Sequence, residues 1–237
     1  MASIRDENGF NQGFKDSFST RARYERRCDY MLSRMDSDSE KHVLEIGCGT
    51  GAMAYSIAKK SGMYVKGIDC SPNFIEKARV DYRYPKLTFD VVDFTKIHIE
   101  EHERFDYLVG NGILHHLFYQ LEDCLRAIHD LLRPGGRIVF LEPNLFNPYI
   151  YLIFSYAPFR KLARLEPDEM AFSKSFIEGL LGKVGFVNIQ VEYRDFLVPG
   201  IPKILVQPSI VIGDILERIP FARMLSQSIF ISADRKR

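Results

Sequence analysis

From residue 42 onward, short apolar runs alternate with segments whose apolar residues recur at helical spacing. The apolar runs predict strands at residues 43–46, 64–68, 87–92, 105–109 and 137–141. The segments between them predict helices at residues 53–60, 72–82 and 121–132. Strands that alternate with helices in this way are typical of βαβ units. The pattern therefore predicts an α/β fold, in which a mostly parallel sheet carries helices on both faces.

Local sequence signals indicate where two of these helices begin and end. Ser71 is a good N-cap for the second helix, and Pro72 suits its first position because proline has no N–H to donate there. The third helix carries Leu121, Leu125, Ile128 and Leu132 on one face. We expect it to stop at Arg133-Pro134-Gly135-Gly136, so that the fifth strand begins only at Arg137.

Other segments fall outside this alternation. Residues 1–40 are polar, with Phe10, Phe14 and Phe18 four residues apart, which predicts a helical lead-in. Residues 41–237 are then expected to form one domain with two cover insertions, at 145–172 and 197–227. The second insertion separates two β-like segments, at 186–196 and 228–233, and it is too long for a hairpin turn. A helix at 173–182, capped by Ser173, lies between the two insertions.

Composition narrows the classes of partner and compartment. Lys and Arg total 32 against 31 for Asp and Glu, so no excess of positive charge suggests a nucleic-acid partner. The four cysteines have no metal-binding or disulfide-like spacing, which favours a cytoplasmic protein with no metal site. The apolar stretches 148–159 and 201–219 are too short or too interrupted to span a bilayer, but contact with a membrane surface stays open.

The clearest chemical signal is a glycine-rich loop between the first strand and the first helix of the alternation. It reads Glu45-Ile46-Gly47-Cys48-Gly49-Thr50-Gly51. Glycines let a ligand approach the backbone, and N–H groups at the helix start can face a polar or anionic group. Asp69 ends the next strand, where a carboxylate can accept hydrogen bonds from ribose hydroxyls. This arrangement fits a nicotinamide dinucleotide as well as other adenosine cofactors.

Five motifs in order make the pattern more specific: LEIGCGTG, GIDCS, VVDF, FDYLVGNGILHHL and LLRPGGRIVFLEPN. Together they resemble the class I methyltransferases that depend on S-adenosylmethionine (SAM), over about residues 40–143 and with most similarity to the small-molecule and ubiquinone/menaquinone branch. The resemblance implies a Rossmann-like sheet whose last strand is antiparallel, and the two late β-like segments resemble the family's antiparallel sixth and seventh strands. It also implies SAM as cofactor, S-adenosylhomocysteine as product, and a small-molecule methyl acceptor. The aromatic and apolar residues of the two insertions extend the choice of acceptor to hydrophobic or lipid-linked molecules.

The resemblance also implies roles for individual residues around SAM. The glycines of the loop would pass beside the methionine part, Asp69 would hold the ribose, and Glu45 would support the loop or reach the amino group of SAM. Asp93, Phe94 and Cys70 would surround the adenine, while Asn111 and Gly112 would line the methionine end. The full set of expected cofactor residues is Glu45, Gly47, Cys48, Gly49, Gly51, Asp69, Cys70, Asp93, Phe94, Asn111 and Gly112.

Three further side chains are candidates for catalysis. His115 and His116 follow the fourth strand on the expected active face, where a base would accelerate methylation of a hydroxyl or amine by about 10²–10⁴-fold. Adjacent side chains usually diverge, so we expect only one of the two to point inward. Glu142 ends the fifth strand and could hold the acceptor or assist the base. The alternative is that these side chains only cap or pack locally.

Several alternatives stay open at this point. A non-catalytic SAM-binding or regulatory protein would keep the same loop, and a nicotinamide-dependent oxidoreductase would use the same glycines and Asp69. The aromatic and basic residues of the two covers suit a lipid headgroup boundary, but they could equally pack on the sheet or form a homodimer contact. The chain could be a monomer or a homodimer.

Overall fold

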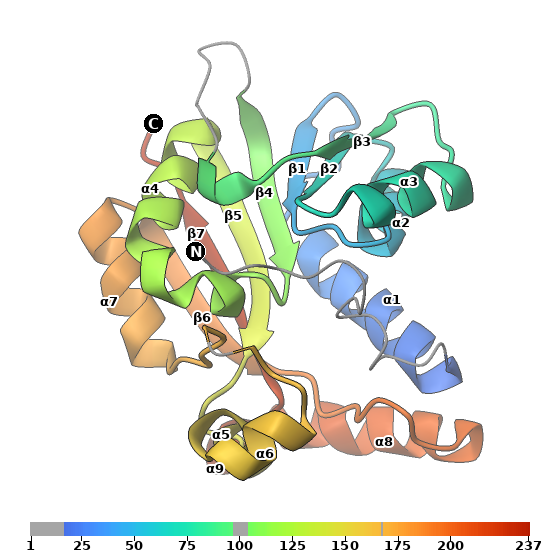
Figure 1. Cartoon of the computed structure of the whole chain (residues 1–237), viewed down its shortest axis with the longest axis vertical. Coiled ribbons are helices and arrows are strands. Elements are labelled where there is room, and N and C mark those ends of the chain that lie inside the picture. The colour runs from blue at the N-terminus through green and yellow to red at the C-terminus, as the bar shows by residue number, and fades with distance from the viewer. Residues whose placement is uncertain (1–16, 97–103, 167) are drawn as a thin grey trace.

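The computed structural model describes residues 17–96, 104–166 and 168–237, which form one seven-stranded sheet with helices on both faces (Figure 1). The strand order is β3-β2-β1-β4-β5-β7-β6. The strands are β1 (His42–Ile46), β2 (Tyr64–Asp69), β3 (Leu87–Val91), β4 (Phe105–Asn111), β5 (Leu132–Pro143), β6 (Val187–Arg194) and β7 (Ser228–Asp234). The order reverses direction between β1 and β4, and the carboxyl ends of these strands meet at one edge, where open α/β sheets bind ligands.

The predicted direction of the strands is confirmed with one refinement. The first five strands are parallel to their neighbours, and β7 is antiparallel to both β5 and β6. Because β6 is antiparallel to β7, it runs in the same direction as the first five strands. The expected antiparallel last strand is therefore confirmed in β7, and β6 and β7 are antiparallel to each other.

Helices cover both faces of the sheet, with a separate apolar core on each side. Helices α1 (Phe18–Leu32), α2 (Ala52–Ser61) and α3 (Pro72–Asp81) pack on one face. Helices α4 (Leu121–Leu131) and α7 (Lys174–Val184) pack on the other. Ser71 accepts a hydrogen bond from the N–H of Phe74, and Ser173 accepts one from Phe176, so both predicted N-caps are confirmed.

The start of the fifth strand differs from the prediction. Helix α4 ends at Leu131, and β5 already begins at Leu132, which has extended dihedral angles and pairs with Phe105. A bulge absorbs the Pro-Gly-Gly segment, because the register shifts between Phe105 and Tyr107 before regular pairing resumes at Arg137. Gly136 fits here because a Cβ at this position would lie 2.9 Å from the carbonyl oxygen of Asp106. The segment that stops the helix is thus itself part of the strand.

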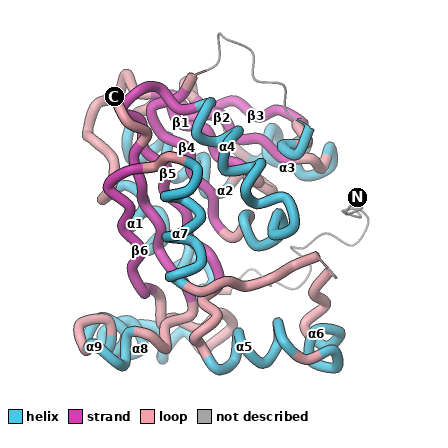
Figure 2. The backbone as a smooth tube through the Cα atoms, turned by 90° about the vertical axis from the view of Figure 1, so that its left-hand side faces the viewer, coloured by secondary structure: helices cyan, strands magenta, loops and turns pink. Residues whose placement is uncertain are grey.

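The two cover segments lie together at one end of the molecule, beyond the carboxyl ends of β4 and β5 (Figures 1 and 2). They contain α5 (Pro148–Ser155) and α6 (Ala157–Leu162) in the first segment, and α8 (Lys203–Leu216) and α9 (Pro220–Arg223) in the second. We call this end of the molecule the cover end. None of the helices in the described residues is both long and apolar enough to cross a membrane.

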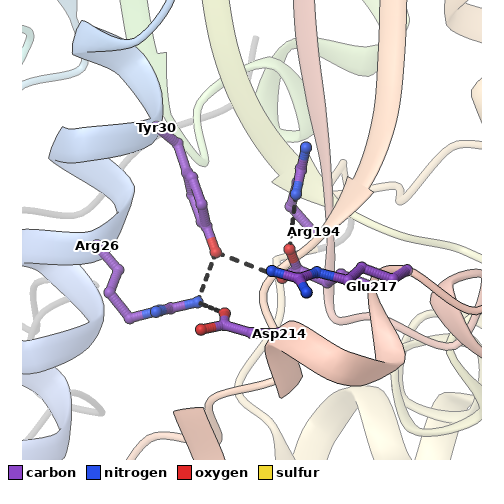
Figure 3. Close-up of a pocket in the computed structure, with 6 residues that line it drawn as sticks. Arg26, Tyr30, Arg194, Asp214 and Glu217 are labelled. Atoms are coloured by element: carbon purple, nitrogen blue, oxygen red, sulfur yellow. Dashed lines mark hydrogen bonds and ion pairs between the residues drawn. The ribbon is translucent and has the colours of Figure 1, made fainter. Parts of the chain in front are cut away.

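Helix α1 connects the cover end to the rest of the domain. Arg26 and Asp214 form an ion pair at 2.6 Å, and Tyr30 donates a hydrogen bond to Glu217 at 3.3 Å (Figure 3). Arg194 of β6 pairs with the same Glu217 at 2.8 Å. These polar contacts fasten one side of α8 against α1. Of the phenylalanines that predicted the helical lead-in, Phe18 begins α1, whereas Phe10 and Phe14 lie outside the described residues.

Candidate active site

The glycine-rich loop lies between β1 and α2, close to the end of β4. The N–H of Cys48 donates to the carbonyl of Ile68 on the neighbouring strand at 2.9 Å, which holds the loop against β2. Gly47 has a φ of +67°, and a Cβ at this position would lie 2.6 Å from the side chain of Ile113. Only glycine avoids both the strained dihedral and this clash. The loop therefore lies directly beside the segment that follows β4.

Asp69 is held at the mouth of this loop by two backbone groups. Its Oδ2 accepts from the N–H of Gly49 and its Oδ1 from the N–H of Ser71, each at 2.9 Å. A carboxylate has about four acceptor positions, so a group held in this way can serve more than two donors. Cys70, the next residue, is half-buried beside it. The carboxylate is thus oriented in advance by the loop and by the start of the next helix.

Glu45 is a buried carboxyl group beneath the same loop. It is 2% exposed and accepts a hydrogen bond from the backbone N–H of Ala54 in α2. Its Oε2 is one of three buried side-chain N or O atoms without a hydrogen-bond partner among the described residues. Burial raises the pKa of Glu45 to about 8. A buried carboxyl oxygen without a partner costs free energy unless a ligand supplies a donor or a cation.

The remaining expected cofactor residues lie at the ends of β3 and β4. Asp93 accepts hydrogen bonds from the adjacent Thr95 and Lys96, and although burial opposes it, these bonds hold the pKa of Asp93 below its usual value. Phe94 is buried directly after it. Gly112 follows β4 and donates its N–H to Leu141 at 2.7 Å. The carboxyl ends of β1 to β4 therefore bring the expected residues to one edge of the sheet.

A network from α1, which the sequence analysis missed, reaches the same edge. The Nη1 of Arg27 donates to Oδ1 of Asn111 at 2.7 Å, and its Nη2 donates to the hydroxyl of Ser228 at 2.8 Å. Arg27 and Arg23 both donate to Oδ2 of Asp195, which is 3% exposed. The sequence offered only a run of arginines near the N-terminus as a signal. Asn111, which was expected to line the methionine end of the SAM site, is therefore also part of a buried ionic network.

His115 and Glu142 form a hydrogen-bonded pair where β4 and β5 end. The Nδ1 of His115 lies 2.8 Å from Oε2 of Glu142, and Oε1 of Glu142 accepts from the N–H groups of Ile113 and Leu114. The carboxylate can only accept, so Nδ1 is the nitrogen that carries the hydrogen in the neutral ring. The Nε2 atom of His115 is then free to act as a proton acceptor.

His116 lies beside His115 instead of pointing away from it. The two ring centroids are 4.1 Å apart, and both rings approach Glu169, at 3.9 Å for His115 and 3.6 Å for His116. The expectation that only one histidine points inward is wrong, because both rings approach Glu169 from the 3-10 helix (Leu114–Gln120) that follows β4. Burial, helped by the neighbouring His115, lowers the pKa of His116 to about 2, so its ring is neutral at physiological pH.

Glu169 completes this cluster from the first cover segment. Its carboxyl group is buried, which raises its pKa, and the next residue, Met170, donates its N–H to the carbonyl of His115 at 3.0 Å. One ligand atom from each of His115, His116 and Glu169 lies within 4.8 Å of the others, so the three could hold a metal ion. No metal site was expected from the sequence, and Glu169 carries no sequence signal, because it lies 53 positions beyond His116 in an irregular segment with no recognisable spacing.

Comparison with known proteins gives consistent matches. Residues 37–174 match the model of a methyltransferase domain family. The chain is 31% identical over 147 residues to the ubiquinone biosynthesis O-methyltransferase of Vibrio vulnificus, which covers 60% of each protein. It is 29% identical over 146 residues to the demethylmenaquinone methyltransferase of Chlorobaculum tepidum, covering 60% of this chain and 56% of that protein. The matched part thus spans about 60% of the length of these curated relatives.

A solved structure resembles the chain over most of its length. The SAM-dependent methyltransferase from Mesorhizobium loti superimposes with a TM-score of 0.65 and 19% sequence identity. The superposition covers 87% of this chain and 96% of that one. The likeness extends beyond the segment matched by the family model, and it supports the Rossmann-like fold that the sequence predicted.

Proposed function

Because the chain belongs to the class I SAM-dependent methyltransferases, we propose that it transfers a methyl group from SAM to an oxygen atom of a hydrophobic small molecule. The observation that carries this proposal is the pair formed by His115 and Glu142, at 2.8 Å, beside the glycine-rich loop. A hydroxyl acceptor gains most from a base in this position. The relative from Vibrio vulnificus is named an O-methyltransferase, which supports an oxygen acceptor.

The residues around the loop fit SAM. Glu45 offers a buried oxygen without a partner, which suits the positively charged amino group of SAM. Asp69 is oriented by two backbone bonds at the end of β2, where a carboxylate can accept hydrogen bonds from the ribose hydroxyls. Asp93 and Phe94 are available for the adenine at the end of β3. When bound, SAM supplies a methyl group on a positively charged sulfur atom.

The histidine cluster forms the acceptor side of this proposal. The Nε2 of His115 takes the proton of the acceptor hydroxyl, and Glu142 stabilises the imidazolium that results. His116 stays neutral and positions the acceptor next to His115. Phe154 of α5 lies edge-on to His115, with ring centroids 6.0 Å apart, so an apolar wall adjoins the base. This wall supports a hydrophobic acceptor.

A direct experiment tests the proposal. Purified protein would be denatured and its bound small molecules identified by mass spectrometry, followed by transfer assays with labelled SAM. The acceptors would be hydrophobic phenols with free hydroxyl groups and, as a comparison, their fully O-methylated forms. Methylation of the free hydroxyls alone is expected. Retention of SAM without transfer to any acceptor would favour a non-catalytic SAM-binding protein.

Asp69 provides a first test of cofactor binding. The Asp69→Ala variant is expected to bind SAM more weakly by about 1.5–3 kcal/mol, the range for hydrogen bonds with a charged partner. Titration calorimetry would measure this change. The matched control is Asp90→Ala, which removes a half-exposed carboxylate from the neighbouring strand β3 and should leave the affinity unchanged. Equal affinities in parent and Asp69→Ala would contradict the assignment of Asp69 to the ribose.

Glu45 provides a second test, through pH. Without a ligand its carboxyl group is protonated below a pKa of about 8, whereas the amino group of SAM pairs with the carboxylate form. Binding below pH 8 must therefore release a proton, and SAM affinity should rise with pH up to about 8, by at most about tenfold per pH unit. Calorimetry in buffers of different ionisation enthalpy detects the proton. Glu45→Gln should lose the pH dependence, and an unchanged slope in this variant would refute the pairing.

A further inference from the structure

The cover end carries most of the exposed apolar surface of the molecule. Of the 24 exposed large hydrophobic side chains among the described residues, seven lie in the first cover segment and nine in the second. The most exposed are Leu162, Ile204 and Phe221, at 81%, 83% and 85%. Single exposed hydrophobic residues are ordinary, but a concentration of this size at one end marks an interaction surface.

Helix α8 turns its apolar face away from the protein. Ile204, Val211 and Ile215 follow one another at helical spacing, and all three are more than half exposed. The opposite face packs on the protein through Val206, which is fully buried, and Gly213, where a Cβ would lie 3.1 Å from that of Phe196. Asp214, at the side of the helix, pairs with Arg26 of α1. The exposed apolar stripe of α8 is therefore not used by the fold and is available to another apolar partner.

The charges around this surface identify the partner. In the described parts of both cover segments, the five most exposed charged residues are all basic: Lys161, Arg164, Lys203, Arg218 and Arg223. The acidic residues there are less exposed, and two of them, Asp214 and Glu217, pair with arginines of α1 and β6. Two copies meeting through this surface would bring cations against cations. An apolar surface bordered by exposed cations, beside which Asp214 and Glu217 are already paired with arginines, instead complements an anionic lipid bilayer.

We propose that the cover end docks on an anionic membrane surface, with α5 and α8 inserting apolar side chains at the boundary between headgroups and acyl chains. The role of this docking, which is to deliver the acceptor, rests on the proposed function, because the same segments contact the acceptor side of the site. Helix α5 presents Tyr151 outward and Phe154 toward His115, and Glu169 of the same segment adjoins both histidines. A hydrophobic acceptor dissolved in the bilayer then reaches the base directly from the docked end.

The test is sedimentation of the full chain with vesicles of phosphatidylcholine alone and with vesicles that also contain about 30% phosphatidylglycerol, an anionic lipid. Binding is expected with the anionic vesicles and should weaken as salt is added. The double variant Ile204→Asn/Ile215→Asn should bind at least about tenfold more weakly, since each buried aliphatic side chain contributes about 1.5–3 kcal/mol. Removal of one cation, as in Lys161→Ala, corresponds to about 1 kcal/mol, or roughly a fivefold loss.

The control is Val80→Asn, which changes an exposed aliphatic residue of α3 and should leave vesicle binding unchanged. Equal binding to neutral and anionic vesicles, or none to either, would overturn the docking proposal. So would a dimer in light scattering that Ile204→Asn/Ile215→Asn dissociates. Methylation assayed on detergent-dispersed acceptor without vesicles separates the two ideas: activity without vesicle binding rejects docking alone, whereas vesicle binding without methyl transfer supports docking and rejects the proposed function.

Discussion

The variant His115→Gln is expected to lose about 10²–10⁴-fold in turnover, the usual contribution of a general base. Glutamine keeps a polar side chain of similar reach but cannot take up a proton. The affinity for SAM should stay nearly unchanged, because His115 lies on the acceptor side of the site and contacts Glu142 and the cover segment. Single-turnover rates with labelled SAM, together with calorimetry, would separate the two effects.

Two further variants make this result specific. His129→Gln changes a histidine in the last turn of α4, on a different part of the surface, and should keep parental turnover. Glu142→Gln can still accept the backbone bonds of Ile113 and Leu114, but it cannot stabilise a charged ring, so the pH profile of turnover should shift as well as its height. Parental turnover in both His115→Gln and Glu142→Gln would mean that positioning alone explains the catalysis.

The largest expected effect on stability comes from Asp195→Asn, which should lower the free energy of unfolding by about 3–5 kcal/mol. The carboxylate is 3% exposed and receives hydrogen bonds from Arg23 and Arg27. Asparagine tolerates the φ of +74° at this position about as well as aspartate, so the change removes mainly the charge. Two buried guanidinium groups then lose their common anion. Urea denaturation at pH 7 would measure the difference.

The difference in stability between the parent and Asp195→Asn should depend on pH. Burial alone would raise the pKa of Asp195, but Arg27 and Arg23 hold it below its usual value of 3.8. A lowered pKa in the folded state contributes stability above the unfolded pKa and loses it as the pH falls through the folded pKa. The stabilities of parent and Asp195→Asn should therefore converge below about pH 4.

Asp214→Asn is the matched control for this experiment. Asp214 also pairs with an arginine of α1, but its side chain is 45% exposed. Exposed pairs contribute about 0–1 kcal/mol, so this variant should remain close to the parent. Equal losses of unfolding free energy in Asp195→Asn and Asp214→Asn would indicate that burial of the Asp195 network adds no stability.

The parts of the fold that the sequence predicted depend on local chemistry. The alternation of apolar runs, the caps at Ser71 and Ser173 and the glycine-rich loop each act over a few residues, and the structure has all of them. The predicted start of the fifth strand at Arg137 was wrong, because the local signal before it is compatible with two structures. The Pro-Gly-Gly segment ends a helix in isolation, but pairing with β4 allows the strand to carry it as a bulge.

The residues that were missed around the site depend on contacts between distant parts of the chain. Arg27 and Asp195 are separated by 168 positions, and Glu169 lies in an irregular loop that only folding brings to His115. No periodicity or spacing marks such pairs in a single sequence. The histidine pair was misjudged for a related reason, since adjacent side chains were expected to diverge, whereas both rings approach Glu169 from a distant segment.

The strand order also bears on how the chain is made. Strand β7 follows all other strands in the sequence, yet it lies between β5 and β6 inside the sheet. Among the described residues, β6 pairs with β7 alone. A chain still on the ribosome would therefore hold β6 without a partner and β5 with one unpaired edge, and Ser228 would not yet be present to bind Arg27. Such edges are prone to aggregate, so we expect this protein to depend on chaperones until its synthesis passes residue 234.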